Sequence, residues 1–346
     1  MSSAPPLAVP GQPSIKDVAS RAGVSTTTVS RVLTDAEAVR PALRARVQQA
    51  IAELGWRPSL AARRLRQRRT SLIGLVVADI RNPFFTEIGR AVEDVAYAAG
   101  LRLILCNSDE DPAKEQSYLE LMADERASGV ILAPTLEFTQ RPGFPGGPWP
   151  FPLVMVDRAP AATACDAALL DNAAAAHTLA AHLAAEGCRR IALLAGAHSS
   201  TGRERQAGYE AALRKAGLAP RVLPLRPDAQ AGQAGAAQLL AEPADRRPDA
   251  LLATSGLLLL GAWRALRASG LRVPAEVALA GFDDNDWTTM PEPAITVLAQ
   301  PTQELGRSAA ELLLQRLAEP GRAPRRVVLQ GRLLVRGSSR HGRGAA

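Results

Sequence analysis

Two kinds of hydrophobic pattern divide the chain near residue 70. Before this point, apolar residues recur at helical spacing in three short segments, which predicts three amphipathic helices. After it, short aliphatic runs alternate with helix-like segments, a pattern typical of repeated βα units around a parallel sheet. The sequence therefore predicts an all-α head followed by an α/β body.

The helices of the head are bounded by start and stop signals. Gly23 permits a left-handed turn after the first helix, and the hydroxyl of Ser25 can cap the second. A third helix is expected over 40–54, with Pro41 near its start and Gly55 just past its end. The apolar positions expected to face inward are Val18, Ala19, Ala22, Val29, Val32, Leu33, Val47, Ile51 and Leu54.

The body contains seven aliphatic runs that are strand candidates, at 72–77, 101–105, 129–132, 153–156, 191–194, 250–253 and 277–281. Alanine- and leucine-rich segments such as 85–100 and 172–187 lie between them and predict helices. A cluster of proline and glycine over 141–150 is expected to form a surface loop. We attribute the abundance of alanine over 159–185 to helix propensity and compositional bias.

The first two helices, within 17–33, predict a helix-turn-helix that reads DNA. The second helix is expected to turn Thr26, Thr27, Ser30 and Arg31 outward, on a surface that can enter the major groove. An ordinary helical hairpin buried in a core is the less favoured alternative.

Charge is distributed unevenly in a way that supports this interpretation. Residues 1–70 hold 12 Lys and Arg against 4 Asp and Glu, whereas the rest of the chain holds 29 against 30. The head therefore carries a charge of +8 and the body −1. A basic module on a near-neutral body is typical of a polyanion-binding head joined to a sensing or enzymatic body. A membrane surface is a less favoured partner.

Length and cysteine content narrow the class of protein further. The 346 residues suggest two or three domains. Cys106, Cys165 and Cys188 are widely separated and odd in number, which argues against a disulfide framework or a clustered zinc site and favours a reducing cytosol. Residues 1–13 contain four prolines and no basic region, so we expect a disordered tail and not a secretory signal. No run is long enough to span a bilayer, and the expected location is the cytoplasm.

Short motifs follow one another along the chain in a characteristic order. The head contains 17–33, then Arg44-Ala45-Arg46-Val47, 50–58 and Ala62-Arg63-Arg64-Leu65. The body contains Asn82-Pro83-Phe84-Phe85, Asp157-Arg158, Asp171-Asn172, 205–209, 270–274, Gly281-Phe282-Asp283-Asp284 and Gln300-Pro301. Each body motif is weak alone, but their order behind such a head is highly specific. In this order the chain resembles the LacI/GalR-type transcriptional repressors.

The resemblance implies a two-lobed, periplasmic-binding-protein-like (type I) α/β body with parallel sheets. Three crossovers would join the lobes, and a small-molecule effector would bind between them. The head would be a helix-turn-helix domain over 14–58, followed by a hinge helix and linker over 59–70. The body would occupy 71–340, with lobe 1 at about 71–169 and 301–327 and lobe 2 at about 170–300 and 328–340.

The resemblance also assigns roles on DNA. Thr26 and Thr27 occupy the principal base-reading positions, where a hydroxyl can donate or accept and a methyl can contact thymine. Arg31 suits a guanine edge or a phosphate. The hydroxyls of Ser25, Thr28 and Ser30 are expected to grip phosphate or to cap the helix.

Two further DNA contacts are expected outside this helix. Arg40 stands where many relatives carry serine, and it can still bind a phosphate. Within the hinge motif, Ala62 and Leu65 are expected at the minor groove, with Leu65 as a wedge that opens the central base step. Packing of Leu65 on the body is the alternative. A two-fold dimer would bind a pseudo-palindromic operator.

The expected effector site combines aromatic and charged residues. Phe84 and Phe85 can stack on a sugar ring or a base, or they can belong to the core. Arg205 is expected to clamp a hydroxyl or carboxylate, with a surface pair to Glu204 as the alternative. Asp283 suits vicinal hydroxyls at the carboxyl end of a strand, or it can serve as a structural cap.

The remaining candidates are weaker. Gln300 and Asp157 complete the expected effector site, although Asp157 can instead pair with Arg158. Ser255 and Gly256 stand where relatives usually have Asn-Asp, so we expect a less polar cleft. The identity of the effector, sugar-like or nucleobase-like, stays open, as do repression against activation and dimer against tetramer.

Two other classes of protein are less favoured. An enzyme would use Asp283, Asp284 and Asp286 as acid–base carboxylates, but three acids within four residues more often form a solvated turn. His177 and His182 are five positions apart, which is not the usual zinc spacing. We therefore expect no catalytic activity, no metal and no cofactor. A free-standing sugar-binding protein is disfavoured because it would not need the basic head.

Overall fold

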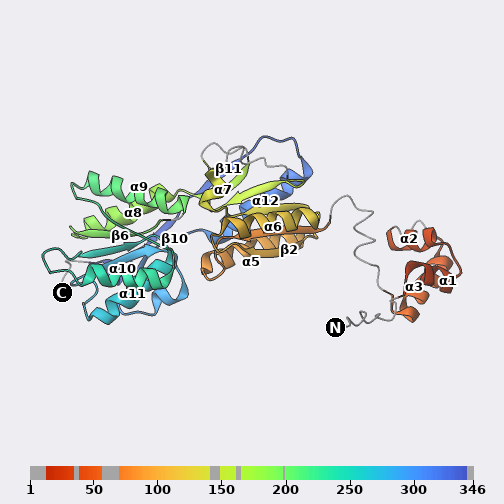
Figure 1. The fold of residues 1–346 in the computed structure, drawn as a ribbon, viewed down its shortest axis with the longest axis horizontal. Helices are drawn as coiled ribbons and strands as arrows, with labels where there is room; N and C mark the ends of the chain where they lie inside the picture. Colours follow the sequence, from red (N-terminus) through yellow and green to blue (C-terminus); the bar gives the residue numbers. More distant parts are fainter. Residues whose placement is uncertain are drawn as a thin grey trace, which may run out of the picture. The chain divides into compact units, whose positions relative to one another are not determined.

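The computed structural model describes residues 13–34, 39–56, 70–140, 149–160, 165–197 and 199–340. The chain forms two compact units, Met1–Arg69 and Thr70–Ala346, which are described one at a time (Figure 1). The expected disordered tail, apart from its last residue, and the hinge helix with Ala62 and Leu65 lie outside the described residues.

The first unit contains the three expected helices, α1 (Ile15–Ala22), α2 (Thr26–Thr34) and α3 (Pro41–Leu54). They share a small core in which Val18, Val29 and Val47 are fully buried. The side chain of Ser14 and that of Asp17 cap the first turn of α1 reciprocally. The stripes predicted from helical spacing thus form the core of the head.

Glycine and arginine fix the turn between α1 and α2. Gly23 is left-handed, with φ +62°, as its position after α1 requires. Arg46 on α3 donates from Nη2 to the Gly23 carbonyl at 3.4 Å, and Arg21 pairs with Glu53 at 2.5 Å. These contacts hold the third helix against the helix-turn-helix.

The second unit contains two six-stranded sheets. Sheet 1 has the order β11-β5-β4-β3-β1-β2, with every pair parallel. Its strands are β1 (Leu72–Val77), β2 (Arg102–Asn107), β3 (Gly129–Leu132), β4 (Leu153–Val156), β5 (Asp166–Leu170) and β11 (Arg326–Leu329). The helices of this lobe are α5 (Pro83–Ala98), α6 (Pro112–Asp124), α7 (Leu136–Gln140) and α12 (Thr302–Ala318).

Sheet 2 repeats this arrangement with the order β12-β10-β9-β8-β6-β7, and only the pair of β10 with β12 is antiparallel. Its strands are β6 (Ile191–Gly196), β7 (Arg221–Leu225), β8 (Ala250–Ala253), β9 (Ala278–Phe282), β10 (Thr296–Ala299) and β12 (Arg332–Leu334). The helices are α8 (Asn172–Ala185), α9 (Ser200–Lys215), α10 (Ala229–Leu240) and α11 (Gly256–Ser269), with 3₁₀ turns η2 (Asp286–Thr289) and η3 (Gly337–Ser339).

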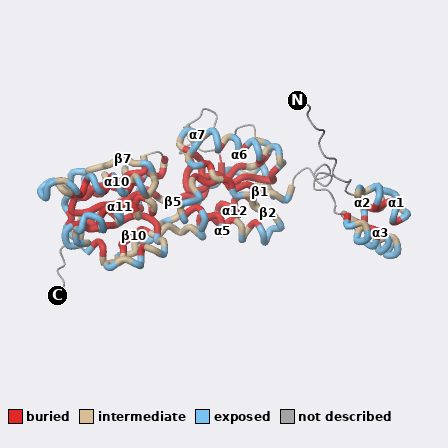
Figure 2. The backbone as a smooth tube through the Cα atoms, turned by 60° about the horizontal axis from the view of Figure 1, so that its bottom comes forward, coloured by how far each residue is buried: buried red, intermediate tan, exposed pale blue. Residues whose placement is uncertain are grey.

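The core of each lobe lies between its sheet and the helices around it. Figure 2 shows buried backbone along the strands and exposed backbone on the outer helix faces. Strands β3, β4, β6 and β8 are buried at every position, as expected for parallel strands covered on both faces. The chain passes between the sheets three times, after β5, β10 and β11.

One expectation about secondary structure is wrong. Helix propensity and compositional bias do not account for the whole alanine-rich stretch 159–185, because it contains strand β5, in which Ala167 and Ala168 are fully buried. Small side chains fit between β4 and β11, so tertiary packing overrides the helix propensity of alanine. Strands β7, β10, β11 and β12 were also not expected. Of the predicted loop over 141–150, residues 141–148 lie outside the described part.

None of the helices within the described ranges is long and apolar enough to cross a membrane.

Candidate functional site

The outer face of α2 carries hydroxyls and one guanidinium. Thr26, Thr27 and Arg31 are exposed, whereas Thr28 and Ser30 are partly buried. Arg31 has no ion-pair partner among the described residues. Three of the four side chains predicted to point outward are thus exposed, and their role on DNA stays a prediction.

The hydroxyls at the start of α2 are already engaged with the helix. Ser25 Oγ accepts from the Thr28 amide at 3.2 Å and shares a hydrogen bond with Thr28 Oγ1 at 3.0 Å. Ser25 therefore caps the helix, one of its two expected roles. Arg40 is exposed at the N-terminus of α3 and makes no side-chain capping bond there.

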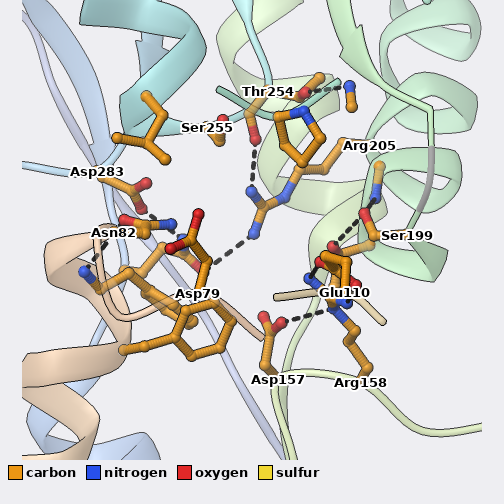
Figure 3. Close-up of a pocket in the computed structure, with 18 residues that line it drawn as sticks. Asp79, Asn82, Glu110, Asp157, Arg158, Ser199, Arg205, Thr254, Ser255 and Asp283 are labelled. Carbon is orange, nitrogen blue, oxygen red and sulfur yellow. Dashed lines mark hydrogen bonds and ion pairs between the residues drawn. The ribbon is translucent and has the colours of Figure 1, made fainter. Parts of the chain in front are cut away.

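The body contains a cavity where the carboxyl ends of strands from both sheets meet (Figure 3). It holds about 590 Å³ of space, part of which is open to solvent. Ligands of open parallel sheets bind at this end of the strands. The structure brings every effector candidate to this cavity: Phe84, Phe85, Asp157, Arg205, Ser255, Asp283 and Gln300.

Arg205 on α9 is the central cation of the cavity. It is 5% exposed and lies over the ring of Phe282, with its guanidinium carbon 4.0 Å from the ring centroid. The guanidinium donates to Asn172 Oδ1 at 2.8 Å, to the Thr254 carbonyl at 2.6 Å and to Gln300 Oε1 at 3.1 Å. Burial lowers the pKa of Arg205, although neighbouring carboxylates oppose this shift.

The alternative pair of Arg205 with Glu204 does not form. Glu204 instead accepts from Asn172 Nδ2 at 2.9 Å, and burial raises the pKa of this carboxyl. Asn172 thus links the two side chains. The three hydrogen bonds of Arg205 end on neutral oxygens, so within the described part of the chain no carboxylate contacts its guanidinium directly.

Asp283 follows β9 with a left-handed backbone, φ +76°. Its Oδ2 accepts from the amide of Gly256 at 2.7 Å, and its Oδ1 accepts from Gln300 Nε2 at 2.5 Å. Asp283 therefore caps the N-terminus of α11 and also lines the cavity, while its binding of an effector stays a prediction. A Cβ at Gly256 would lie 3.0 Å from Asp283 Oδ2, so glycine makes room for this carboxylate.

Ser255 is the N-cap of α11, and its hydroxyl accepts from the Leu258 amide at 3.4 Å. The side chains of Ser255 and Asp283 therefore both serve this helix terminus while they border the cavity.

The opposite wall contains an ion-pair cluster. Asp157, after β4, also has a left-handed backbone, φ +67°, and accepts from Arg158 Nε at 3.0 Å. Arg158 further pairs with Glu110 through two bonds of 2.8 Å (Figure 3). Burial opposes the charge on Arg158, but Glu110 and Asp157 outweigh it and raise the pKa of this guanidinium. Burial raises the pKa of Asp157.

Phe84 and Phe85 stand at the start of α5, where Asn82 caps the helix by accepting from the Phe84 amide at 3.2 Å. Their ring centroids are 5.0 Å apart in an edge-to-face arrangement. Both are 4% exposed and belong to the core of lobe 1, and both line the cavity. The two alternatives for these residues are therefore compatible.

Sequence reasoning missed Glu110, Asp79 and Ser199 as cavity residues, and it missed the positioning role of Asn172. Each lies shortly after a strand of a parallel sheet. Listing the polar residues after every predicted strand would have found them. The partner of each could not be read in this way, because Glu110 and Arg158 are 48 positions apart.

The acidic turn considered for catalysis is occupied by structural contacts. Asp284 pairs with Arg336 at 2.7 Å and accepts from Thr288 Oγ1 at 3.1 Å. His182 Nε2 bonds Ser339 Oγ at 2.8 Å. No group of three potential metal ligands is found within the described ranges.

Arg205 also touches two of the three segments that join the lobes. Asn172 begins α8 directly after the first crossover, and Gln300 lies in the second. The third crossover is tied to the first by a bond of 3.4 Å from Gln330 Nε2 to Asp171 Oδ2. The same guanidinium therefore lines the cavity and bonds residues at two of the crossovers.

Comparison with known proteins covers both units. Residues 14–59 match bacterial regulatory proteins of the lacI family, and residues 180–339 match a periplasmic binding protein-like domain. The chain is 34% identical to the ribose operon repressor of Escherichia coli (strain K12), over 94% of this chain and 99% of the repressor. It is 33% identical to the HTH-type transcriptional repressor PurR of Aliivibrio fischeri (strain ATCC 700601 / ES114), over 94% and 97%.

Solved structures give the same picture. The lac repressor dimer bound to operator and the anti-inducer ONPF has a TM-score of 0.80 at 26% identity and covers 95% of this chain and 99% of that one. The complex of the transcriptional regulator CelR with cellobiose has a TM-score of 0.67 at 31% identity and covers 94% and 99%.

Proposed function

Because the chain belongs to the lacI family of bacterial regulatory proteins, we propose that it represses transcription from a pseudo-palindromic operator and responds to a small molecule in the body cavity. It is a DNA-binding transcriptional regulator with an effector-binding domain, and it is not an enzyme. The observation that carries the proposal is the joint presence of an exposed hydroxyl and guanidinium face on α2 and a buried polar cavity in the body.

On the DNA, α2 is the recognition helix. Thr26 and Thr27 read base edges, and the exposed guanidinium of Arg31 binds a guanine edge or a phosphate. Thr28, Ser30 and the capping Ser25 fix the position of the helix on the backbone.

Further contacts come from outside α2. Arg40 adds a phosphate contact, and Ala62 with Leu65 enters the minor groove. A homodimer would match two half-sites, as the operator complex of the lac repressor dimer does.

In the cavity, Arg205, Asp283 and Gln300 hold the polar groups of the effector, while Phe84 and Phe85 supply an apolar wall. Asp157 and Ser255 border the remaining space. A sugar-like effector is supported by relatives whose solved complexes contain cellobiose and ribose. A nucleobase-like effector is the second candidate, because the two aromatic rings could also stack on a base. We place the protein in the cytoplasm, where promoter DNA and metabolites meet.

The test starts with selection of genomic fragments that the full-length protein binds. Arg31→Ala should weaken binding to the selected site by about tenfold or more, because a bidentate base contact is lost. The wild-type affinity should fall steeply with salt, with a log–log slope of about −0.9 per neutralised phosphate.

Arg90→Ala is the matched control, since Arg90 is an exposed arginine of the body that pairs only with neighbours on α5. The proposal would be refuted if Arg31→Ala and Arg90→Ala lost equal affinity for the selected site. It would also be refuted if DNA binding were weak and insensitive to sequence at every salt concentration.

A further inference from the structure

Glu110 is held rigidly beside the cavity by its loop. Asp109 and Glu110 both have left-handed backbones, with φ +54° and +57°, and Asp111 then caps α6. Lys114 pairs with Asp109 at 2.5 Å and fixes the turn from the other side. The Glu110 carboxylate is 21% exposed and faces the guanidinium of Arg158, which is 7% exposed.

The donors of Arg158 are almost fully occupied. Nε donates to Asp157, Nη1 to Glu110 and to the Pro134 carbonyl, and Nη2 to Glu110. A guanidinium has five N–H groups, so one remains, on Nη2. Two carboxylates contact this one cation. Arg158 is therefore no anchor for an anionic ligand, although it lines the cavity.

The other charges of the cavity favour neutral hydroxyls. Its described lining contains four carboxylates, Asp79, Glu110, Asp157 and Asp283, against two guanidiniums, Arg158 and Arg205. Asp79 pairs with Arg81 at 2.9 Å, so three carboxylates are left against these two cations. Arg205 keeps two N–H groups beyond its three bonds, and each oxygen of Asp283 keeps a lone pair.

A ligand hydroxyl can accept a hydrogen bond from Arg205 and donate one to Asp283. A carboxylate or phosphate could pair with Arg205, but the carboxylates of the lining outnumber its guanidiniums, and burying an anion among them is costly.

We propose that Glu110 is a specificity-determining residue that makes the cavity accept uncharged, hydroxyl-bearing effectors and reject their anionic counterparts. The inference rests on the proposed binding of an effector in this cavity. As the second carboxylate on Arg158, beside Asp157, Glu110 makes this wall of the cavity net negative and so favours neutral ligands over anions.

The test uses a small-molecule extract of bacterial cells, divided on an anion-exchange resin into unretained and retained fractions. The thermal unfolding midpoint of the full-length protein reports binding. The unretained fraction should raise the midpoint of the wild-type protein, and this shift should be the same at low and high salt. The retained fraction should be about tenfold less potent, because like charges repel in the cavity.

Glu110→Gln then tests the residue itself. This variant keeps the size and one acceptor, leaves Arg158 paired with Asp157 alone and removes one negative charge from the cavity, so the retained fraction should gain about tenfold in potency. D-Gluconate and D-glucose provide a defined anionic and neutral pair for the same comparison by calorimetry. Glu93→Gln removes one exposed carboxylate from α5 of the same lobe and should change nothing.

Activity of the retained fraction on the wild-type protein would overturn the inference while the proposed effector function would stand. An unchanged preference in a folded Glu110→Gln variant would overturn the role of Glu110. If Glu110→Gln does not fold, the response of the wild-type protein to the two extract fractions, and the salt dependence of that response, still decide whether the cavity prefers neutral ligands. Inactivity of both fractions would refute effector binding itself, and this inference with it.

Discussion

The two lobes of the body share one topology but present opposite chemistry to the cavity. Strands β4 and β9 occupy equivalent places in their sheets, and each is followed by an aspartate with a left-handed backbone, Asp157 and Asp283. Asp157 is engaged by the neighbouring Arg158. Asp283 binds a helix N-terminus and Gln300, and it keeps lone pairs for a ligand.

The two lobes therefore contribute different groups to the cavity, although they share one fold. Lobe 1 supplies aromatic rings and an ion-pair cluster in which two carboxylates, those of Glu110 and Asp157, surround the single guanidinium of Arg158. Lobe 2 supplies Arg205, whose bonds to neutral oxygens leave both charge and donors for a ligand. We therefore expect the effector to be recognised mainly by lobe 2 and enclosed by lobe 1.

The largest effect is expected for Arg205→Ala. Asn172, the Thr254 carbonyl and Gln300 would lose their buried partner, which should cost about 3 kcal/mol in the free energy of unfolding. Effector affinity should fall about a hundredfold. Urea unfolding and calorimetry measure the two effects.

The control is Arg214→Ala on the same helix, where an exposed i,i+4 pair with Glu210 contributes little. Retention of effector binding by folded Arg205→Ala would show that lobe 2 does not recognise the ligand.

A comparison of Asp283→Asn with Asp157→Asn tests the two equivalent aspartates directly. Both variants tolerate a left-handed backbone, so strain is matched. Asp283→Asn should weaken effector binding by about tenfold or more, because it loses charge and one acceptor at the ligand. Asp157→Asn should change affinity by less, since Arg158 already uses that carboxylate. Equal losses in calorimetric titrations would contradict the division between the lobes.

A smaller effect is expected where the lobes are joined. Asn172→Ala removes the link from the first crossover to Arg205 and Glu204. The ratio of operator affinities with and without effector should fall by about fivefold, which is a loss of coupling of roughly 1 kcal/mol. Gln330→Ala in the third crossover is the control, because its bond to Asp171 is long and exposed. An unchanged ratio for Asn172→Ala in gel-shift titrations would remove Asn172 from the coupling.

The smallest expected effect is on the pH dependence of the free energy of unfolding, and it also differs between the two lobes. The described part of lobe 1 has no histidine, whereas lobe 2 has His177 and His182 on α8. Burial lowers the pKa of His182 below its usual 6.5, so the folded state favours the neutral ring. Stability from this site is complete above pH 6.5 and is lost as pH falls from 6.5 through the lower folded pKa.

His182→Gln should therefore flatten the loss of stability between neutral and mildly acidic pH, measured by urea unfolding. His177→Gln on the same helix is the comparison. An identical pH profile for wild type and His182→Gln would contradict this assignment.

Local signals predicted the head better than the body. Gly23, Ser25 and Gly55 mark turns and caps that depend only on near neighbours, and the helices begin and end beside them. In the body, β5 was hidden because the helix propensity of Ala167 and Ala168 is overridden by neighbours far along the chain.

In the cavity, too, local signals could be predicted from the sequence and long-range contacts could not. Its place after a predicted strand identified Asp283, since the carboxyl ends of parallel strands converge, whereas Asp157 was predicted from the resemblance to the family. The pairs that set its charge were not visible, because Glu110 with Arg158 and Asn172 with Arg205 are brought together only by folding. Sequence alone could therefore name many of the residues but not their electrostatic balance.

The last two strands carry a consequence for biosynthesis. β11 completes one edge of sheet 1 and β12 completes one edge of sheet 2, although only two residues separate them in the chain. Neither lobe can reach its final form on the ribosome until translation has passed Leu334 and the peptide has left the exit tunnel. The two halves of the sensor must therefore mature together after synthesis of this segment, and a nascent chain arrested earlier would expose two unpaired sheet edges at once.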